Sequence, residues 1–161
     1  MKQEQFDVVV VGGGGSGLAA AIAAREAGAR VVLLEKNESL GGSTAWSIGS
    51  ITTTGSPHQQ RAGIEDTPDG HFDDMPLFAP EMAQRDNDTL RRILCDEVPD
   101  AFRWLLSLGV RFFGPMPEPP HTKPRMHNVL QNSKAYIHVL ERHARRLGID
   151  IRLGTQIGEG Q

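Results

Sequence analysis

Apolar and polar positions along the first 35 residues predict a β-strand, an α-helix and a second β-strand. Short apolar runs beside polar and charged residues predict strands at 6–11 and 30–35, and the alanine-rich stretch between them predicts a helix at 16–27. Gly28 stands where a glycine commonly ends a helix. Near the other end, apolar residues recur at intervals of three and four. They predict a helix at 133–147, capped by Ser133 and followed by a strand at 150–153.

The middle of the chain is less regular. We expect a loop at 36–57 with a helical turn after Thr44, then an irregular polar segment at 56–88 in which a short helix near 74–84 is one option. Asp88 is expected to cap a helix that runs to Val98. Pro99 is expected to open another helix, which stops at Gly109. Five prolines between 114 and 124 predict an extended loop.

The order of these elements predicts the fold class. A βαβ unit, a long excursion and a final αβ pair indicate an α/β fold with a Rossmann-like, doubly wound parallel sheet whose strand order is 3-2-1, and which is apparently incomplete. We divide residues 1–161 into a βαβ unit with a loop at 1–55, an irregular and helical excursion at 56–131, and a helix with the third strand at 132–157.

The turn between the first strand and the helix has the pattern Gly12-x-Gly14-x-x-Gly17. Gly12 permits a tight turn, Gly14 lets backbone N–H groups approach a pyrophosphate, and Gly17 lets the helix pack closely on the strand. The start of the helix, with Gly15 and Ser16, offers unpaired N–H groups and partial positive charge to phosphates. This context favours a dinucleotide site, whereas the pattern alone would be weak evidence.

Two further features refine the cofactor prediction. Glu35 ends the second strand, 18 residues after Gly17, where a carboxylate can accept hydrogen bonds from both ribose hydroxyls and would repel a 2′-phosphate. Lys36 weakens that repulsion slightly. A second glycine pair, Gly41-Gly42, suits FAD better than NAD because the longer FAD needs another close approach of the backbone.

The motifs resemble a known family. Residues 5–55 are similar to the N-terminal segment of FAD-binding flavoproteins that include fumarate reductases, succinate dehydrogenases and 3-ketosteroid dehydrogenases, and the resemblance continues more loosely to about residue 157. It implies an FAD-dependent oxidoreductase that transfers a hydride to or from a CH–CH or C=C substrate. The residues expected at the cofactor are Gly12, Gly14, Gly15, Ser16, Gly17, Glu35, Lys36, Gly41, Gly42, Ser43, Thr44, Ser47 and Gly49.

Two departures from the family pattern are informative. Some members carry the flavin covalently on a histidine just after the glycine pair, and this chain has Ser43 there, so we expect FAD to be bound non-covalently. Ser50 follows Gly49 at a position where the family often has a second glycine. Whether the backbone at Ser50 approaches the flavin ring closely is therefore an open question. No position matches the arginine and histidine residues that bind and protonate substrate in the fumarate reductase branch, so the catalytic residues are unknown.

Composition excludes other classes of function. The net charge of −3, from 17 basic and 20 acidic residues, gives no footprint for nucleic acid. A single cysteine, Cys95, excludes an intrachain disulfide and fits a reducing compartment. The polar N-terminus predicts no signal peptide, and we expect no membrane span because the apolar stretches are short. We therefore expect a cytoplasmic protein.

Histidines and tryptophan offer few further candidates. No Cys or His cluster has the spacing of a metal site. His143 is expected to pack on the apolar helix face, and His58, His71 and His121 are expected to be exposed in loops. For His127, which follows the proline-rich loop, a role beside flavin or substrate is the less favoured alternative. Trp46 either lies along the flavin or packs beneath the loop.

Two hypotheses of function remain open. In one, the chain is the FAD-binding part of a flavin oxidoreductase that acts on a small molecule. In the other, it is a non-catalytic nucleotide-binding module or subunit that needs a complementing chain. In either case we expect the 161-residue chain to self-associate, to need a complementing polypeptide, or to occur as a piece of a longer protein, because the first strand would have an unpaired edge.

Overall fold

A computed structural model describes residues 4–158 of the chain. The fold has two compact units: Met1–Gly49 together with Gln131–Gln161, and Ser50–Leu130. Every residue expected at the cofactor lies in the first unit.

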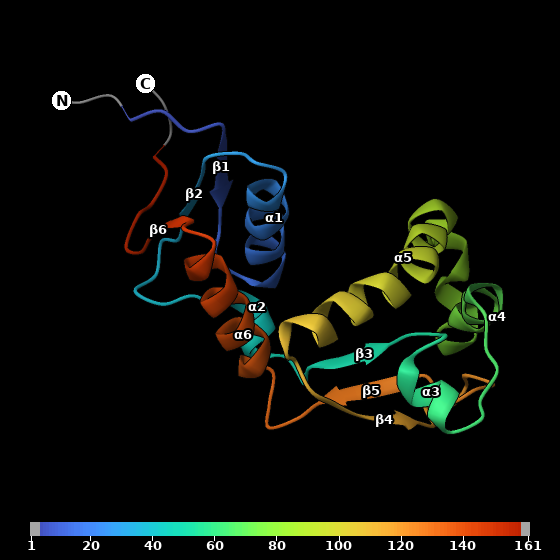
Figure 1. The fold of residues 1–161 in the computed structure, drawn as a ribbon. Coiled ribbons are helices and arrows are strands. Elements are labelled where there is room, and N and C mark those ends of the chain that lie inside the picture. The colour runs from blue at the N-terminus through green and yellow to red at the C-terminus, as the bar shows by residue number, and fades with distance from the viewer. Residues whose placement is uncertain (1–3, 159–161) are drawn as a thin grey trace. The chain divides into compact units, whose positions relative to one another are not determined.

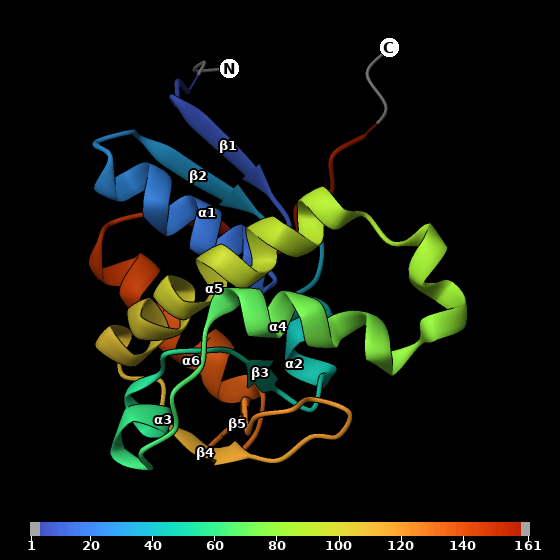
Figure 2. The ribbon, with the colours of Figure 1, turned by 90° about the vertical axis from the view of Figure 1, so that its right-hand side faces the viewer.

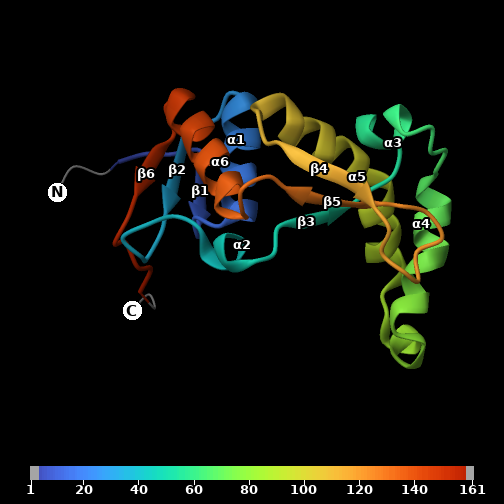
Figure 3. The same ribbon diagram turned by 90° about the horizontal axis from the view of Figure 1, so that it is seen from below.

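The first unit is a parallel sheet with helices packed on it. Its strands are β1 (Val8–Val11), β2 (Val31–Leu34) and β6 (Asp150–Arg152), in the order β1-β2-β6. Val8 pairs with Val31, and Val32 pairs with Asp150, in parallel registers. This order confirms the predicted 3-2-1 topology of an α/β fold, and Figure 3 shows the three strands side by side.

Three helices complete this unit. α1 (Gly15–Glu26) packs against β1, β2 and α6 (Lys134–Arg146), and α6 also packs against the short α2 (Gly42–Trp46) (Figure 1). The core is formed by the buried apolar faces of β2, α1 and α6, with Leu18, Ile22, Leu33 and Leu140 among its residues. In contrast, the Val9 and Val11 side chains of β1 are 53% and 64% exposed.

The second unit contains an antiparallel sheet that the sequence did not predict. β3 (Ser50–Thr52), β5 (Met126–Val129) and β4 (Phe112–Met116) form a sheet in the order β3-β5-β4. Ile51 pairs with His127, and Phe112 pairs with Val129. The predicted extended loop at 114–124 therefore begins inside a strand. The sheet was missed because β3 lies far in sequence from β5, with which it pairs, and because Gly114 and Pro115 interrupt the apolar pattern of β4.

A long helix packs on this sheet. α5 (Asp88–Leu108) places the Phe102 ring 4.5 Å from that of Phe112 and 4.7 Å from that of His127, measured between ring centroids. The prediction of two helices divided at Pro99 was wrong. Cys95, Pro99 and Phe102 lie buried along one face, so packing continues across the residue that lacks an N–H group. The helix does end at Gly109, in a left-handed conformation with φ of 102°.

The remaining short helices precede α5. α3 (Pro57–Arg61) is followed by α4 (Pro68–Asp74), which lies beside α5, and by two 3₁₀ segments, η1 (Met75–Phe78) and η2 (Pro80–Arg85) (Figure 2). The helix suggested near 74–84 is thus replaced by α4 and these tighter turns. Asn87, whose side chain accepts a hydrogen bond from the Leu90 N–H, caps α5 in place of Asp88.

Buried ion pairs connect the loops of the second unit. Arg125 is fully buried, and its Nε and Nη2 atoms donate to the two carboxylate oxygens of Asp66 at 2.7 and 2.8 Å. Its Nη1 atom donates to Asp74, which also accepts hydrogen bonds from the N–H and hydroxyl of Thr122. Burial opposes ionisation of Asp74, but these hydrogen bonds outweigh it and lower its pKa to about 2.

Several histidines lie differently from the prediction. His71 and the side chain of His121 are 3% and 4% exposed, and their ring centroids lie 5.3 Å apart. His58 is half-buried, with its ring centroid 5.8 Å from that of Phe102. His127 is fully buried and both of its ring nitrogens are engaged, by the Arg125 carbonyl and by the Ser56 hydroxyl. These hydrogen bonds favour a structural role for His127 in the core over a role beside a ligand.

Candidate nucleotide-binding site

The glycine turn after β1 has the shape that the sequence predicted. Gly12 adopts a φ of +99°, a left-handed conformation that favours glycine. A Cβ atom on Gly17 would lie 1.9 Å from the Gly12 carbonyl oxygen, so α1 can approach the turn only when residue 17 is glycine. Both glycines are therefore required by the fold of the chain itself.

Gly14 differs from them. Its φ of −79° and ψ of −176° suit any residue, and a Cβ atom there would meet the Gly41 carbonyl oxygen at 3.7 Å, an ordinary contact. The chain itself gives no reason for glycine at this position. A ligand that approaches the backbone closely supplies one, so the turn fits a bound pyrophosphate.

The second glycine pair lies against this turn. Gly14 and Gly41 form a parallel bridge, and the Gly41 N–H donates to the Gly13 carbonyl at 2.9 Å. The Thr44 hydroxyl accepts a hydrogen bond from the Gly15 N–H at 3.2 Å. The structure thus brings the two predicted glycine elements into one backbone cluster.

Glu35 is joined to the same cluster. Its carboxylate is buried and accepts hydrogen bonds from the Gly13 N–H at 2.7 Å and from the N–H and side-chain amide of Asn37 at 2.9 and 2.7 Å. The N–H groups of Asn37 and Gly13 lower the pKa of Glu35. The side chain is therefore ionised and fixed at the end of β2, with acceptor capacity beyond these three bonds because a carboxylate offers about four lone-pair sites.

Other predicted residues lie around this cluster with less contact. Ser16 is exposed in the first turn of α1, and Gly42, Ser43 and Lys36 are exposed. Ser47 donates to the Thr44 carbonyl and ends α2. Gly49 is buried, and its carbonyl accepts a hydrogen bond from the Tyr136 hydroxyl at 2.7 Å.

Sequence reasoning missed the residues that support the site. Asn37 orients Glu35, and Leu40 packs over Gly13 so closely that its Cδ2 atom would lie 2.2 Å from an added Cβ. Ser133 does not cap α6 with its side chain, as predicted; its hydroxyl donates instead to the Ala45 carbonyl and ties α6 to α2. Among these residues, only Asn37, two positions after Glu35, could have been suspected from its place in the sequence.

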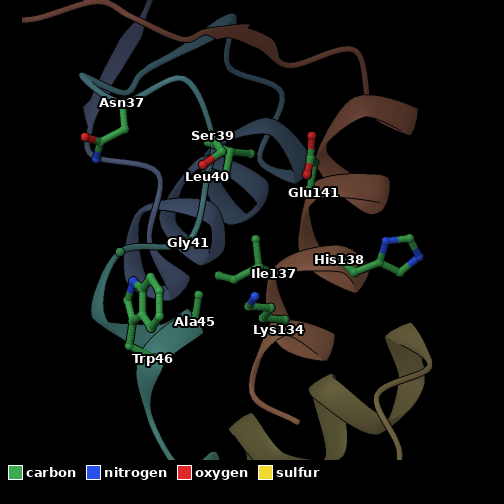
Figure 4. Close-up of a pocket in the computed structure, with 11 residues that line it drawn as sticks. Asn37, Ser39, Leu40, Gly41, Ala45, Trp46, Lys134, Ile137, His138 and Glu141 are labelled. Atoms are coloured by element: carbon green, nitrogen blue, oxygen red, sulfur yellow. The ribbon is translucent and has the colours of Figure 1, made fainter. Parts of the chain in front are cut away.

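A cavity of about 640 Å³ lies between the segment 37–46 and α6 (Figure 4). The Trp46 side chain is 86% exposed, and the Lys134 Nζ atom is 5.8 Å from its ring centroid. Trp46 therefore does not pack beneath the loop. Gly41 and Gly42 line both this cavity and the glycine cluster, whereas the turn 12–17 does not line it.

Two other side chains agree with the sequence analysis. Cys95 is a fully buried free thiol, and burial raises its pKa. His143 is partly buried on α6 and lies 3.2 Å from a carboxylate oxygen of Glu26. Within residues 4–158, no group of three or more His, Cys, Asp or Glu side chains is placed to hold a metal ion.

The fold and the glycine cluster define a protein of the dinucleotide-binding class. The profile of the family described as the FAD binding domain matches residues 7–158, and the chain belongs to this family. It is the FAD-binding portion of a flavoprotein related to fumarate reductases and 3-ketosteroid dehydrogenases.

Individual relatives give the extent of the match. A probable fumarate reductase of Shewanella frigidimarina is 32% identical over 161 residues, which cover 96% of this chain and 26% of that protein. A urocanate reductase of Eggerthella lenta is 40% identical over 115 residues, 67% of this chain and 18% of that protein. The open conformation of a flavocytochrome c3 fumarate reductase superposes with a TM-score of 0.85 at 30% identity, over 94% of this chain and 27% of that one. The chain thus spans about a quarter or less of these relatives.

Within the described residues, no helix combines the length and apolar character needed to cross a membrane.

Proposed function

We propose that this chain is the cofactor-holding part of an FAD-dependent oxidoreductase that acts on a CH–CH or C=C bond. The main support is the joint geometry of three elements: the turn 12–17, the glycine pair 41–42 and the carboxylate of Glu35 form one hydrogen-bonded cluster. Gly14 adds a specific argument, because its lack of a side chain serves a ligand and not the fold.

Each part of the cluster has a role toward FAD. The N–H groups of Ser16, at the start of α1, and of Gly42 would bind the pyrophosphate. The N–H groups of Gly15 and Gly41 are bonded to the Thr44 hydroxyl and the Gly13 carbonyl, so these two residues would hold the turn in shape around the ligand. Glu35 would accept hydrogen bonds from the adenosine ribose hydroxyls. We propose further contacts to the cofactor from Lys36, Ser43, Thr44, Ser47 and Gly49, which follow Glu35 along the chain. In such enzymes FAD supplies the redox chemistry, and the protein supplies binding and orientation.

The link to FAD is proposed to be non-covalent. Ser43 stands where some family members have the linking histidine, and residues 36–49 contain no histidine. Acid precipitation of purified holoprotein should therefore release the flavin into a yellow supernatant. Flavin that stays in the washed, denatured pellet would disprove the non-covalent link.

The substrate is proposed from the relatives. The names of proteins similar to this chain include fumarate and urocanate reductases, a 4-oxocyclohexanecarboxylate 2-dehydrogenase and a 3-oxosteroid 1-dehydrogenase. The shared chemistry is a C=C bond conjugated to, or formed beside, a carbonyl or carboxyl group. We also propose a cytoplasmic location, which suits the buried free thiol of Cys95.

A second candidate function is a non-catalytic FAD-binding module that needs a complementing polypeptide. The exposed Val9 and Val11 side chains on the edge strand β1 favour it. A dye-linked reductase assay of the FAD-loaded chain separates the two. Turnover by the 161-residue chain alone supports the enzyme, whereas turnover only after a second polypeptide is added supports the module.

A further inference from the structure

Asn37 places two hydrogen-bond donors on one oxygen of the Glu35 carboxylate. Its backbone N–H and its side-chain amide donate to Oε1 at 2.9 and 2.7 Å. The other oxygen, Oε2, accepts one hydrogen bond, from the Gly13 N–H at 2.7 Å. Each carboxylate oxygen has about two lone-pair sites. Oε1 is therefore fully used within the chain, and the spare acceptor site of Glu35 lies on Oε2.

The backbone of Asn37 is held in place independently of its side chain. Its carbonyl accepts a hydrogen bond from the Gly154 N–H at 3.0 Å. Two residues earlier, the Glu35 N–H donates to the Arg152 carbonyl at 2.9 Å, and the Glu35 carbonyl accepts from the Thr155 N–H at 2.9 Å. These bonds continue the pairing of β2 with β6 beyond the strand ends. A substitution at position 37 can thus remove the amide and leave the bonds that place the loop.

The ionisation of Glu35 depends on the same contacts. The residue is 6% exposed, and burial alone would raise the pKa of its carboxyl group. The N–H groups of Asn37 and then of Gly13 outweigh burial and lower this pKa below its ordinary value. The side-chain amide of Asn37 and the positive charge of Lys36 lower it further. Asn37 therefore acts on both the orientation and the charge of the carboxylate.

One more charged side chain comes from the strand beside β2. The guanidinium of Arg152 on β6 is bonded to the carboxylates of Asp150 and Glu4. Its charge is engaged by these partners. The contacts that keep Glu35 ionised are thus the ones from Asn37, Gly13 and Lys36.

We infer that Asn37 is a positioning residue for the cofactor, because its side-chain amide holds the Glu35 carboxylate in one orientation and leaves Oε2 to accept a hydrogen bond from the ribose. The inference rests on the proposed function, in which Glu35 binds the adenosine ribose of FAD. It adds a residue that acts on the cofactor through Glu35 and that the sequence pattern of the site did not include.

The first test is a double-mutant cycle on FAD affinity, measured by quenching of flavin fluorescence with the 161-residue chain at pH 7. Asn37→Ala should raise the dissociation constant about 2- to 12-fold, the size of one lost hydrogen bond. In the Glu35→Ala background the same substitution should change it by less than about twofold, because the residue acts through Glu35. Ser39 is exposed in the same loop, and Ser39→Ala should leave the constant unchanged.

The second test follows the charge of Glu35 in the FAD-free chain. Asn37→Asp replaces the donor amide by a carboxylate of the same shape, and like charge and the lost hydrogen bond should both raise the pKa of Glu35. NMR of chain labelled with ¹³C in its glutamate carboxyl groups measures this titration, and the signal lost in Glu35→Gln assigns it. We expect Glu35 to titrate at a higher pH in Asn37→Asp than in wild type.

FAD affinity should follow the same titration. The ribose bond needs an ionised carboxylate, so affinity is present above the pKa of Glu35 and is lost as the pH falls through it. In Asn37→Asp this loss should begin at a higher pH. Ser39→Asp adds the same charge to the same loop and, at about 0.15 M salt, should move the titration less. A purely structural role would lower the melting temperature of Asn37→Asp and leave the titration of Glu35 in place.

Three outcomes would overturn the inference while leaving the proposed function intact. In the first, Asn37→Ala binds FAD like wild type although Glu35→Ala binds it weakly. In the second, Asn37→Ala weakens binding equally in the Glu35→Ala background, which would make Asn37 a direct contact. In the third, Asn37→Ala binds FAD more tightly, which would make the amide a competitor of the ribose. An unchanged affinity in Glu35→Ala itself would contradict both the inference and the ribose contact on which it rests.

Discussion

The glycines of the G-x-G-x-x-G pattern, Gly12, Gly14 and Gly17, should respond differently to alanine, because two of them serve the fold and Gly14 serves the ligand. A Cβ atom on Gly17 would lie 1.9 Å from the Gly12 carbonyl oxygen, far inside any normal contact. Overpacking of this kind costs about 1–3 kcal/mol, offset in part by a gain in helix propensity of about 1 kcal/mol. Because the obstacle is a backbone atom, we place the cost at the upper end of this range, which leaves about 2 kcal/mol net, and Gly17→Ala should lower the melting temperature by roughly 4–8 °C.

Gly14→Ala should leave the fold nearly unchanged. Its backbone conformation accepts alanine, and the nearest atom to the new Cβ is the Gly41 carbonyl oxygen at 3.7 Å. Loss of the glycine at the N-cap costs about 1 kcal/mol, and the reduced entropy of the unfolded chain returns a similar amount. The melting temperature should stay within about 3 °C of the wild-type value.

Although Gly14→Ala should hardly change stability, it should clearly weaken FAD binding. In Gly14→Ala the added methyl group occupies the space of the pyrophosphate and weakens charge-assisted hydrogen bonds, which are worth roughly 1.5–3 kcal/mol, or about 10- to 150-fold in the dissociation constant. Quenching of flavin fluorescence measures this constant, and circular dichroism measures melting of the same samples. If folded Gly14→Ala protein bound FAD within about twofold of wild type, the pyrophosphate would not pass over Gly14 and our placement of the cofactor would be wrong.

Three further predictions concern the strand-end acid, the buried ion pairs and the sheet edge. Glu35→Ala should weaken FAD binding by roughly 1.5–3 kcal/mol and also lower thermal stability, because the Gly13 and Asn37 N–H groups lose their acceptor; an unchanged dissociation constant would contradict a ribose contact. Arg125→Met should destabilise the chain by about 3–5 kcal/mol in urea unfolding at pH 7, since its two carboxylate partners stay buried without a cation, and a loss under about 1 kcal/mol would show that water reaches them. The isolated chain should self-associate in size-exclusion chromatography with light scattering, and Val9→Lys/Val11→Lys should reduce that association; a monodisperse wild-type monomer would refute it.

Local signals in the sequence were sufficient for the first unit. The strand at 8–11, the glycine turn, the helix after it and the strand that ends before Glu35 are contiguous in the chain, so their pattern specifies both their type and their parallel arrangement. The position of Glu35 at the carboxyl end of the second strand was predicted as well, but its hydrogen bond from the Gly13 N–H was not.

The second unit was less predictable because its main contacts are distant in sequence. β3 and β5 pair across about 75 residues, and no turn signal joins them. Arg125 reaches Asp66 and Asp74 from more than 50 residues away, which no spacing rule detects. The burial of His71 and His121 follows from those contacts, so the prediction that these histidines are exposed failed with them.

The buried ion pairs of Arg125 connect the stability of the second unit to the charge of its histidines. A guanidinium in the open would be a natural partner of a bound carboxylate. Here the same group is bonded to Asp66 and Asp74, and burial together with its positive charge lowers the pKa of His71 and His121. The interactions that hold the loops together therefore leave Arg125 unavailable to an anion and keep both histidines neutral at pH 7.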